Sequence, residues 1–289
     1  MAVACFVLAA LSAVAAEDAG YVQSIEAYRR DREQRLRADD GWLTLVGLFW
    51  LEPGKTAFGA DRALPIALPV GPPKAGTLEL VGDTVRLHAE PGVGLSIGGE
   101  TVTDRVLADD AAGKPDIVEL DRLRFHVIRR GDRFGVRVKD PQAPTRKGFG
   151  GLTYYPVDPA FRVVARFERY ESPRPVEVAT VAGVVETMTI PGKLTFELGG
   201  ATRTLEPLLE QPDDTDLFVI FRDATSGSET YGAGRYLYAT VDGTAAVIDF
   251  NRAYNPPCAF TPFATCPLPP RGNRLDVPIR AGEKRYGDH

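Results

Sequence analysis

The chain has 289 residues, of which 44% are hydrophobic and 25% charged, and its formal net charge is −5. Its 29 glycines and 23 prolines are too few for a disordered or collagen-like chain, so a globular protein is expected. The mild negative charge, without a clustered basic stripe, excludes a surface built to neutralise phosphates, and nucleic acid is not expected as a partner. The length favours two packed modules over a single pair of layers.

Residues 1–16, MAVACFVLAALSAVAA, are predicted to be a signal peptide. They carry no charge, are apolar from Val3 to Val14 and end in small residues, although the usual basic start is missing. A lipid anchor at Cys5 is disfavoured because the apolar segment follows the cysteine. The stretch is too short to span a bilayer and no later segment is apolar enough, so a periplasmic or secreted protein without a membrane span is predicted.

Removal of that peptide leaves two cysteines, Cys258 and Cys266, within the proline-rich stretch NPPCAFTPFATCPLPP. In an oxidising compartment they are predicted to form a disulfide. Closing this loop would constrain the unfolded chain by about 2.6 kcal/mol in the entropy model. A thioredoxin-like pair would have C-x-x-C spacing. Zinc would need two more ligands, and both His88 and His126 are expected to face outward from strands, so no metal site is predicted.

In chain order, the first predicted element is a helix over residues 22–38. It is charged on most of its circumference, with Ile25, Tyr28 and Leu36 available for docking. The apolar segment DGWLTLVGLFWLEPG follows, and residues 17–54 are treated as one N-terminal segment. Its two tryptophans, Trp42 and Trp50, indicate a buried strand or hairpin, with an exposed aromatic ligand platform as the alternative.

Residues 55–140 alternate between short apolar-polar runs and turns, which predicts a first β-sandwich module. The runs GKTAFGADRALPIALP and GLSIGGETV are similar to a forkhead-associated sandwich, but the phosphothreonine-binding Ser and His of that family have no counterpart. The composition of DPQAPTRKGFGG places the module boundary at residue 140. Residues 141–289 again show strand-length runs and predict a second β-sandwich or rolled sheet, so the protein is expected to be mainly β.

Polar residues gather where two apolar strands of the second module end, in FRDATSGSETYGAGRYL and DFNRAYNPPC. Such groups can converge at one mouth of a sheet, with the cysteine loop holding its rim. The predicted ligand-binding residues are Tyr231, Arg235, Tyr236, Asn251, Arg252, Tyr254 and Asn273. The alternative is that these charges form a structural ion-pair network with turn-capping asparagines.

Catalysis is a separate hypothesis for the same mouth. The sequence contains no G-x-S-x-G, Walker or Rossmann motif. Asp223, Glu229 and Asp249 are candidates for the acid and base of a hydrolase, but their separation is not fixed by the sequence.

The strings DGWLTLVGLFWLEPG, FRDATSGSETYGAGRYL and DFNRAYNPPCAFTPFATCPLPPRGNRLDVPIRAGEK together resemble the bacterial and archaeal family called domain of unknown function 1684, from about Tyr21 to Lys284. The resemblance implies no activity or cofactor. If cytosolic members keep the pair at Cys258 and Cys266, a thiol or metal role gains weight over a disulfide.

Three functions follow as hypotheses. The leading one is an extracytoplasmic protein that binds a carbohydrate or anionic metabolite at the second module. The second is the hydrolase. The third is an envelope interaction module, which predicts an exposed apolar patch and no pocket. Neither a cofactor nor an oligomeric state is predicted.

Overall fold

The computed structural model describes residues 2–211 and 214–287, with side chains from residue 19 onward except at 112. The backbone of α1 (Ala2–Arg37) is one helix, which confirms the predicted helix over residues 22–38. The side chains of the predicted signal peptide, and His289, lie outside the described residues. No helix among the described residues combines the length and the apolar character needed to cross a membrane.

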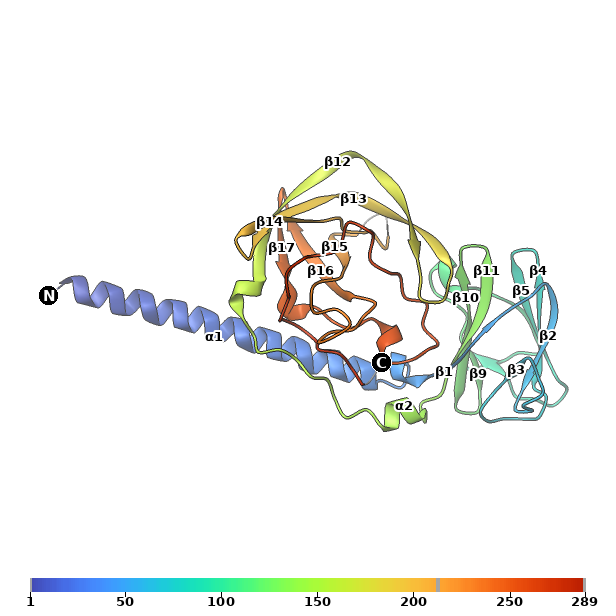
Figure 1. The fold of residues 1–289 in the computed structure, drawn as a ribbon. Helices are drawn as coiled ribbons and strands as arrows, with labels where there is room; N and C mark the ends of the chain where they lie inside the picture. The colour runs from blue at the N-terminus through green and yellow to red at the C-terminus, as the bar shows by residue number, and fades with distance from the viewer. Residues whose placement is uncertain (1, 212–213, 288–289) are drawn as a thin grey trace.

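The C-terminal half of α1 packs along the second module, as Figure 1 shows. Ile25 and Leu36 are fully buried, as the sequence predicted. Charged side chains dock as well: Arg32 donates from Nε to Glu283 at 3.1 Å and from Nη2 to the carbonyl of Asn255 at 2.9 Å. The helix is therefore an integral part of the second module.

The first module is a sandwich of two sheets, as predicted. One sheet has the strand order β1 (Leu45–Trp50), β11 (Arg133–Lys139), β10 (Leu123–Arg130), β9 (Val118–Leu120), β6 (Ser96–Ile97), β7 (Glu100–Thr101). The other has the order β3 (Ile66–Ala67), β2 (Gly54–Gly59), β4 (Gly76–Val81), β5 (Thr84–Ala89), β8 (Asp104–Leu107).

The boundary of this module differs from the predicted one at residue 55. β1 pairs antiparallel with β11, so the apolar segment belongs to the sandwich, which begins at Leu45. Residues 45–50 are therefore a strand, as predicted, but only Leu45 and Gly47 are buried and the other four residues are half-buried. The two sheets pack together because apolar and polar residues alternate in β10 and β11. This alternation places Phe125, Val127 and Val136 in the core between the sheets.

The outward side of β10 and β11 does not face solvent. His126 and Arg137, which are cross-strand partners, are 8% and 4% exposed. The expectation that His126 faces outward is correct for the sandwich, but the second module covers that face. His88, by contrast, is half-buried beside Glu79 and Asp104.

The second module is one rolled antiparallel sheet. Its strand order is β14 (Ala201–Leu205), β13 (Val185–Leu198), β12 (Arg162–Ala179), β17 (Ala245–Asp249), β16 (Arg235–Asp242), β15 (Asp216–Phe221). The chain after β14 joins the two sides, because Leu208 exchanges two backbone hydrogen bonds with Phe218 and Leu209 bonds to Thr189. The sequence left open a sandwich or a rolled sheet, and the structure has the latter.

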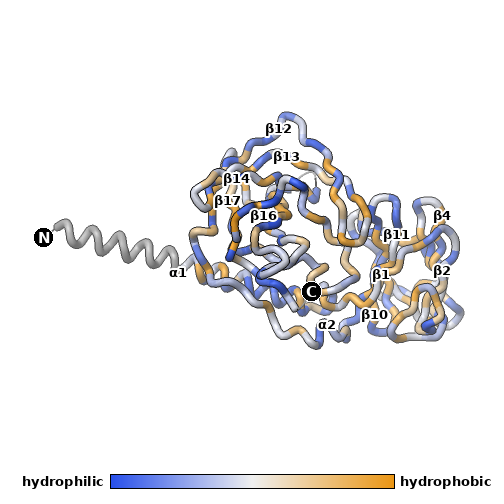
Figure 2. The backbone as a smooth tube through the Cα atoms, viewed as in Figure 1, coloured by the Kyte–Doolittle hydropathy of each residue, from blue (hydrophilic) through white to orange (hydrophobic). Residues whose placement is uncertain are grey.

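Short helices mark the connections. They are η1 (Trp42–Thr44), η2 (Asp110–Ala112), α2 (Pro144–Lys147), η3 (Pro159–Phe161), η4 (Phe250–Arg252) and η5 (Pro257–Ala259). Hydrophobic and hydrophilic residues are interleaved through both modules (Figure 2), as expected for strands with one side in a core.

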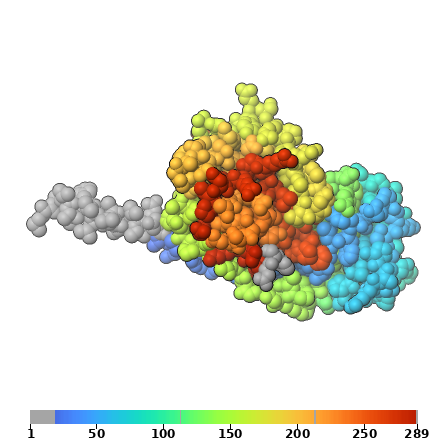
Figure 3. All heavy atoms as spheres, viewed as in Figure 1, coloured from blue at the N-terminus to red at the C-terminus, as the bar shows by residue number. Residues whose placement is uncertain are grey.

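The C-terminal segment lies across one face of the second module, shown in red in Figure 3. Leu275, Ile279 and Ala281 are buried in the core of the rolled sheet. Leu275 also donates its backbone N–H to the carbonyl of Arg222 at 2.8 Å. This segment therefore closes one end of the rolled sheet, next to the loop after β15 that the sequence predicted as a site.

Candidate functional site

The predicted polar cluster after β15 is centred on a buried ion pair. Arg235 is completely buried, and its Nη2 lies 2.9 Å from the carboxylate of Asp223, which is 5% exposed. The same guanidinium donates to the carbonyls of Ile279, Ala281 and Glu283. Arg235 therefore holds the C-terminal segment in place and is not the accessible ligand donor that the sequence suggested, because its charge and most of its donors are already satisfied.

The local sequence explains this pair. Asp223 also accepts from the backbone and hydroxyl of Thr225 at 2.8 and 2.5 Å, which folds the loop back at the end of β15. Gly234 precedes Arg235 with φ +109°, and a Cβ there would lie 2.7 Å from the carbonyl oxygen of Phe221. The glycine lets the loop approach β15 closely enough to bury the arginine.

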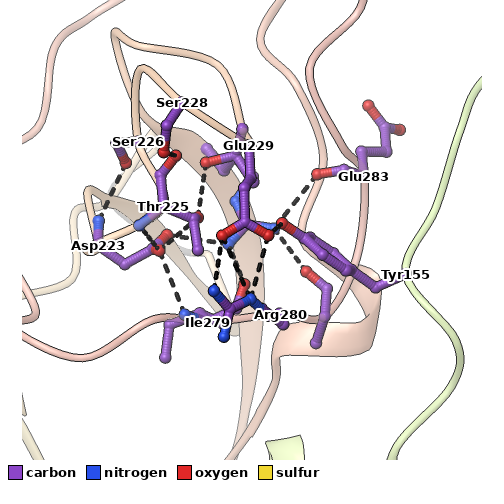
Figure 4. Close-up of polar contacts among 12 residues, drawn as sticks. Tyr155, Asp223, Thr225, Ser226, Ser228, Glu229, Ile279, Arg280 and Glu283 are labelled. Atoms are coloured by element: carbon purple, nitrogen blue, oxygen red, sulfur yellow. Dashed lines mark hydrogen bonds and ion pairs between the residues drawn. The ribbon is translucent and has the colours of Figure 1, made fainter.

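Glu229 occupies the outer side of the same loop. Figure 4 shows its carboxylate between Arg280 and Tyr155, with Nε and Nη2 of the guanidinium and the phenol donating to it. The hydrogen bond from Arg280 lowers the pKa of Glu229, and burial raises the pKa of Tyr155 to about 12. A carboxylic acid held ionised in this way is a poor general acid.

The third candidate carboxylate, Asp249, belongs to a different network. It accepts from the phenol of Tyr21 at 2.8 Å and from the backbone of Asn251 at 3.1 Å. Asn251 is 1% exposed and donates to Tyr21 and to the carbonyl of Asp158. These residues join α1 to the second module, so Asp223, Glu229 and Asp249 each serve separate structural contacts.

Two further predicted residues have similar roles. Asn273 is 1% exposed and bonds the backbone of Glu206 in both directions, as well as the carbonyl of Ile220. Arg252 is about half exposed, with Nε 3.5 Å from Asp249. The structural-network alternative therefore describes Arg235, Asn251 and Asn273 better than ligand binding does.

A large cavity of about 1030 Å³ lies elsewhere, at the junction of the two modules and α1. Its walls come from seven parts of the chain: α1, the segment before β1, the β10–β11 hairpin, the end of β12–β13, the loop after β14, the β15–β16 pair and the cysteine loop. Among the lining residues are five arginines and two glutamates: Arg32, Arg35, Arg129, Arg130, Arg137, Glu186 and Glu210. The cavity is therefore cationic in a protein whose formal net charge is negative.

Arg137 is the unusual member of this set. It is 4% exposed, its Nη2 donates to the hydroxyl of Thr265 at 3.2 Å, and its guanidinium lies 5.2 Å from the ring centre of Trp42. Its Nε is buried without a hydrogen-bond partner. The other four cavity arginines pair with carboxylates, whereas Arg137 has no carboxylate within salt-bridge distance among the described residues.

The electrostatics of the cavity wall follow from this arrangement. Burial, and next the neighbouring Arg130, lower the pKa of Arg137 to about 10, which leaves it charged at neutral pH. Burial also raises the pKa of Glu186. A buried cation without an anion is costly, and a bound anion would remove that cost.

Part of the cavity wall is aromatic. Tyr236 is 5% exposed and packs edge to face against Phe218 and Tyr254, with ring centres 5.0 and 5.8 Å apart. The phenol of Tyr236 donates to the carbonyl of Pro267 at 2.6 Å. Tyr236 and Tyr254 thus are the two predicted ligand-binding residues that the structure places in the cavity wall. Tyr231 instead donates to the carbonyl of Cys258.

The cysteine loop forms one side of the cavity through Pro257, Thr265 and Cys266. Both cysteines are free thiols, so the predicted disulfide is not formed in this structure. They are nevertheless adjacent, since the backbone N–H of Cys258 donates to Sγ of Cys266 at 3.2 Å. The sequence suggested that this loop holds the rim of the polar cluster after β15. The loop does line a cavity, but it is the cavity between the modules.

Sequence reasoning missed Arg130, Arg137 and Thr265. Arg137 alternates with Val136 and Val138, a pattern that is typical of a solvent-exposed strand position. The available signal was Trp42, for which an aromatic ligand platform was the alternative, and Trp42 does line the cavity. Among the described residues, no three His, Cys, Asp or Glu side chains are grouped so that they could hold a metal ion.

Comparison with known proteins gives a family without a described activity. The model of the family described as Protein of unknown function (DUF1684) matches residues 147–284, the second module. The resemblance was expected to begin at about Tyr21. The family model matches only from residue 147, so the N-terminal part of the expected range lies outside the match. No protein of curated function matches the chain.

Two solved structures are similar to parts of the chain. An uncharacterised protein of Haloarcula marismortui, solved by NMR, is 35% identical over 50% of this chain and 81% of its own, with a TM-score of 0.42. A domain from a study of phosphothreonine-dependent FHA domain interactions is 18% identical over 33% of this chain and 96% of its own, with a TM-score of 0.23, which establishes no common fold. From the family match and the 35% identical relative, the chain belongs to the DUF1684 family.

Proposed function

We propose that the protein binds a small anionic ligand in the cavity between its modules, outside the cytoplasm. The observation that carries the proposal is Arg137, a buried guanidinium without a carboxylate partner in the wall of a 1030 Å³ cavity. Arginine is suited to carboxylate and phosphate groups because its donors form a planar fork. The extracytoplasmic location rests on the uncharged apolar pattern of residues 1–16.

The shape and lining indicate which anions fit. Ligand cavities of several hundred Å³ usually combine apolar or aromatic walls with a few directing polar groups. Here Tyr236, Tyr254 and Trp42 offer ring faces and edges, while Arg137 and Arg130 lie on the side of Thr265. An anion attached to a ring, such as a sugar acid, a sugar phosphate or an aromatic acid, could contact both the arginines and the aromatic side chains.

The other two hypotheses receive less support. Hydrolysis by Asp223, Glu229 or Asp249 has no geometric basis, since each carboxylate serves a separate network. An envelope module without a small-molecule site was expected to lack a pocket, whereas this protein has a cavity of about 1030 Å³. In the oxidising compartment proposed here, Cys258 and Cys266 would also form the disulfide that the sequence suggested.

Calorimetric titration with phenyl phosphate and inorganic phosphate tests the proposal. We expect binding to the wild type, with phenyl phosphate bound more tightly, and at least a tenfold loss of affinity in Arg137→Met, since a charged hydrogen bond contributes roughly 1.5–3 kcal/mol. Arg129→Met is the matched control, because Arg129 lines the same cavity but pairs with Asp83. Equal affinity in wild type and Arg137→Met, or no binding of either probe at millimolar concentration, would contradict the proposal.

A further inference from the structure

Cys258 and Cys266 are placed as an unequal pair. Cys266 is 5% exposed and lines the cavity, whereas Cys258 is half-buried at the start of the loop. The hydrogen bond between the two thiols lowers the pKa of Cys258 and raises that of Cys266, and the phenol of Tyr231 also lowers the former. One sulfur is thus prepared to be the thiolate and the other to remain a neutral, protected thiol.

The loop that carries the pair is anchored on both sides. The phenol of Tyr231 donates to the carbonyl of Cys258 at 3.2 Å. At the other end, the carbonyl of Cys266 accepts from the backbone of Val181 at 2.9 Å. The backbone is therefore held with the two sulfurs facing each other, so that little rearrangement is needed to join them.

The pair is also adjacent to the anion site. Thr265, which precedes Cys266, is 7% exposed, and its hydroxyl accepts from both Arg130 and Arg137 at 3.1 and 3.2 Å. A chemical change at Cys266 can therefore reach the two guanidinium groups through the neighbouring Thr265 hydroxyl.

We propose that Cys258 and Cys266 form a redox-active dithiol whose oxidation state sets the affinity of the cavity for its anion. The redox chemistry of the pair is inferred from the geometry of the thiols alone. Its effect on anion affinity rests on the proposed function. The structure represents the dithiol form. The C-x7-C spacing differs from that of thioredoxin-like pairs, so tertiary structure, rather than a helix start, brings the sulfurs together.

The chemistry balances with a low-molecular-weight disulfide as oxidant. The Cys258 thiolate attacks one sulfur of the disulfide RSSR, which forms a mixed disulfide and releases RS⁻. Cys266 then loses its proton and attacks the Cys258 sulfur, which releases the second RS⁻. The protein loses two thiol protons and two electrons, and RSSR becomes two RSH.

The direction of the coupling follows from charge. A thiolate at Cys258, the form through which the pair reacts, would place negative charge near the cavity and oppose a bound anion. The disulfide carries none, so the oxidised form binds the anion more tightly. By linkage, a bound anion stabilises the disulfide to the same extent.

The first experiment tests the unequal pair without any ligand. Oxidised glutathione is added to the reduced protein, and products are followed by mass spectrometry in wild type, Cys258→Ser and Cys266→Ser. We expect an internal disulfide in the wild type, a persistent glutathione adduct in Cys266→Ser, and reaction at least about tenfold slower in Cys258→Ser. Equal rates in the two variants, or a wild type that remains a dithiol in excess oxidised glutathione, would overturn the redox proposal. Thermal unfolding of both variants confirms that they fold.

The second experiment tests the coupling, with phenyl phosphate as the probe. Its affinity is measured by calorimetry on the oxidised and the reduced wild type. We expect about tenfold tighter binding to the oxidised form, which corresponds to a reduction potential about 30 mV more negative with saturating probe. Equal affinity for both forms would overturn the coupling. Binding to neither form would instead contradict the anion site, while the first experiment still decides the redox chemistry.

Discussion

The protein buries two arginines in different ways, and the difference distinguishes a structural arginine from one that is available to bind a ligand. Arg235 is fully buried, with Asp223 and three backbone carbonyls as partners. Arg137 is 4% exposed, with only a hydroxyl and an aromatic face. Burial lowers the pKa of both guanidinium groups. A buried guanidinium with a carboxylate partner inside the fold indicates a structural role, whereas one beside a cavity without a carboxylate partner indicates a ligand.

The largest effect is expected where the buried charge is best paired. Asp223→Ala removes the carboxylate from Arg235 and leaves the guanidinium buried without an anion. We expect the free energy of unfolding to fall by roughly 3–5 kcal/mol, measured by urea denaturation. Asp31→Ala is the control, since Asp31 pairs with Arg35 and both side chains are more than half exposed. A loss no larger than that of the control would show that Arg235 is not held by this pair.

His126 provides the next largest effect because it lies beside Arg137. Burial, and next the unneutralised charge of Arg137, lower the pKa of His126 from 6.5 to about 4. The unfolded chain therefore binds a proton that the folded chain does not between these values. The stabilisation is complete above about pH 6.5 and declines as pH falls toward 4, by roughly 3 kcal/mol in total.

Urea denaturation of His126→Gln as a function of pH measures this contribution. The variant should lose less stability than the wild type between pH 6.5 and 4. In Arg137→Met, the pKa of His126 measured by NMR should rise. An unchanged pKa would mean that Arg137 is neutralised by a partner, contrary to its assignment as the open cation.

Arg137 itself is expected to show a smaller effect of the opposite sign. Arg137→Met replaces an incompletely paired buried cation with an apolar side chain. Without ligand, we expect the variant to be as stable as the wild type, or more stable by about 1 kcal/mol, in thermal and urea unfolding. A loss of several kcal/mol would place Arg137 in the same structural class as Arg235.

The smallest effect is expected at Glu229, on the exposed side of the polar cluster. Its partner Arg280 is more than half exposed, so Glu229→Gln should leave thermal stability unchanged. Phenyl phosphate binding should also be unchanged, because Glu229 does not line the cavity. A loss of probe binding would indicate that the ligand binds at the loop after β15 and not in the cavity.

The sequence by itself determined the local elements of this protein. Alternation at Phe125, Val127 and Val136 determined the strands and their core side, and the apolar positions Ile25 and Leu36 determined the docking stripe of α1. Strand and helix periodicity are visible in sequence because each depends on residues only two to four positions apart. The family resemblance was equally local, since it rested on continuous strings of the sequence, and the family model matches the range that holds those of the second module.

Tertiary structure alone decided which outward residues became buried and which polar residues found partners. Arg137 and Arg235 both stand in strands beside apolar neighbours, and the sequence marked the second as the ligand donor. The C-terminal segment, more than forty residues away, satisfies Arg235. The second module covers Arg137 without supplying an anion. Burial and pairing of a charge depend on contacts between distant segments, and no local pattern encodes them.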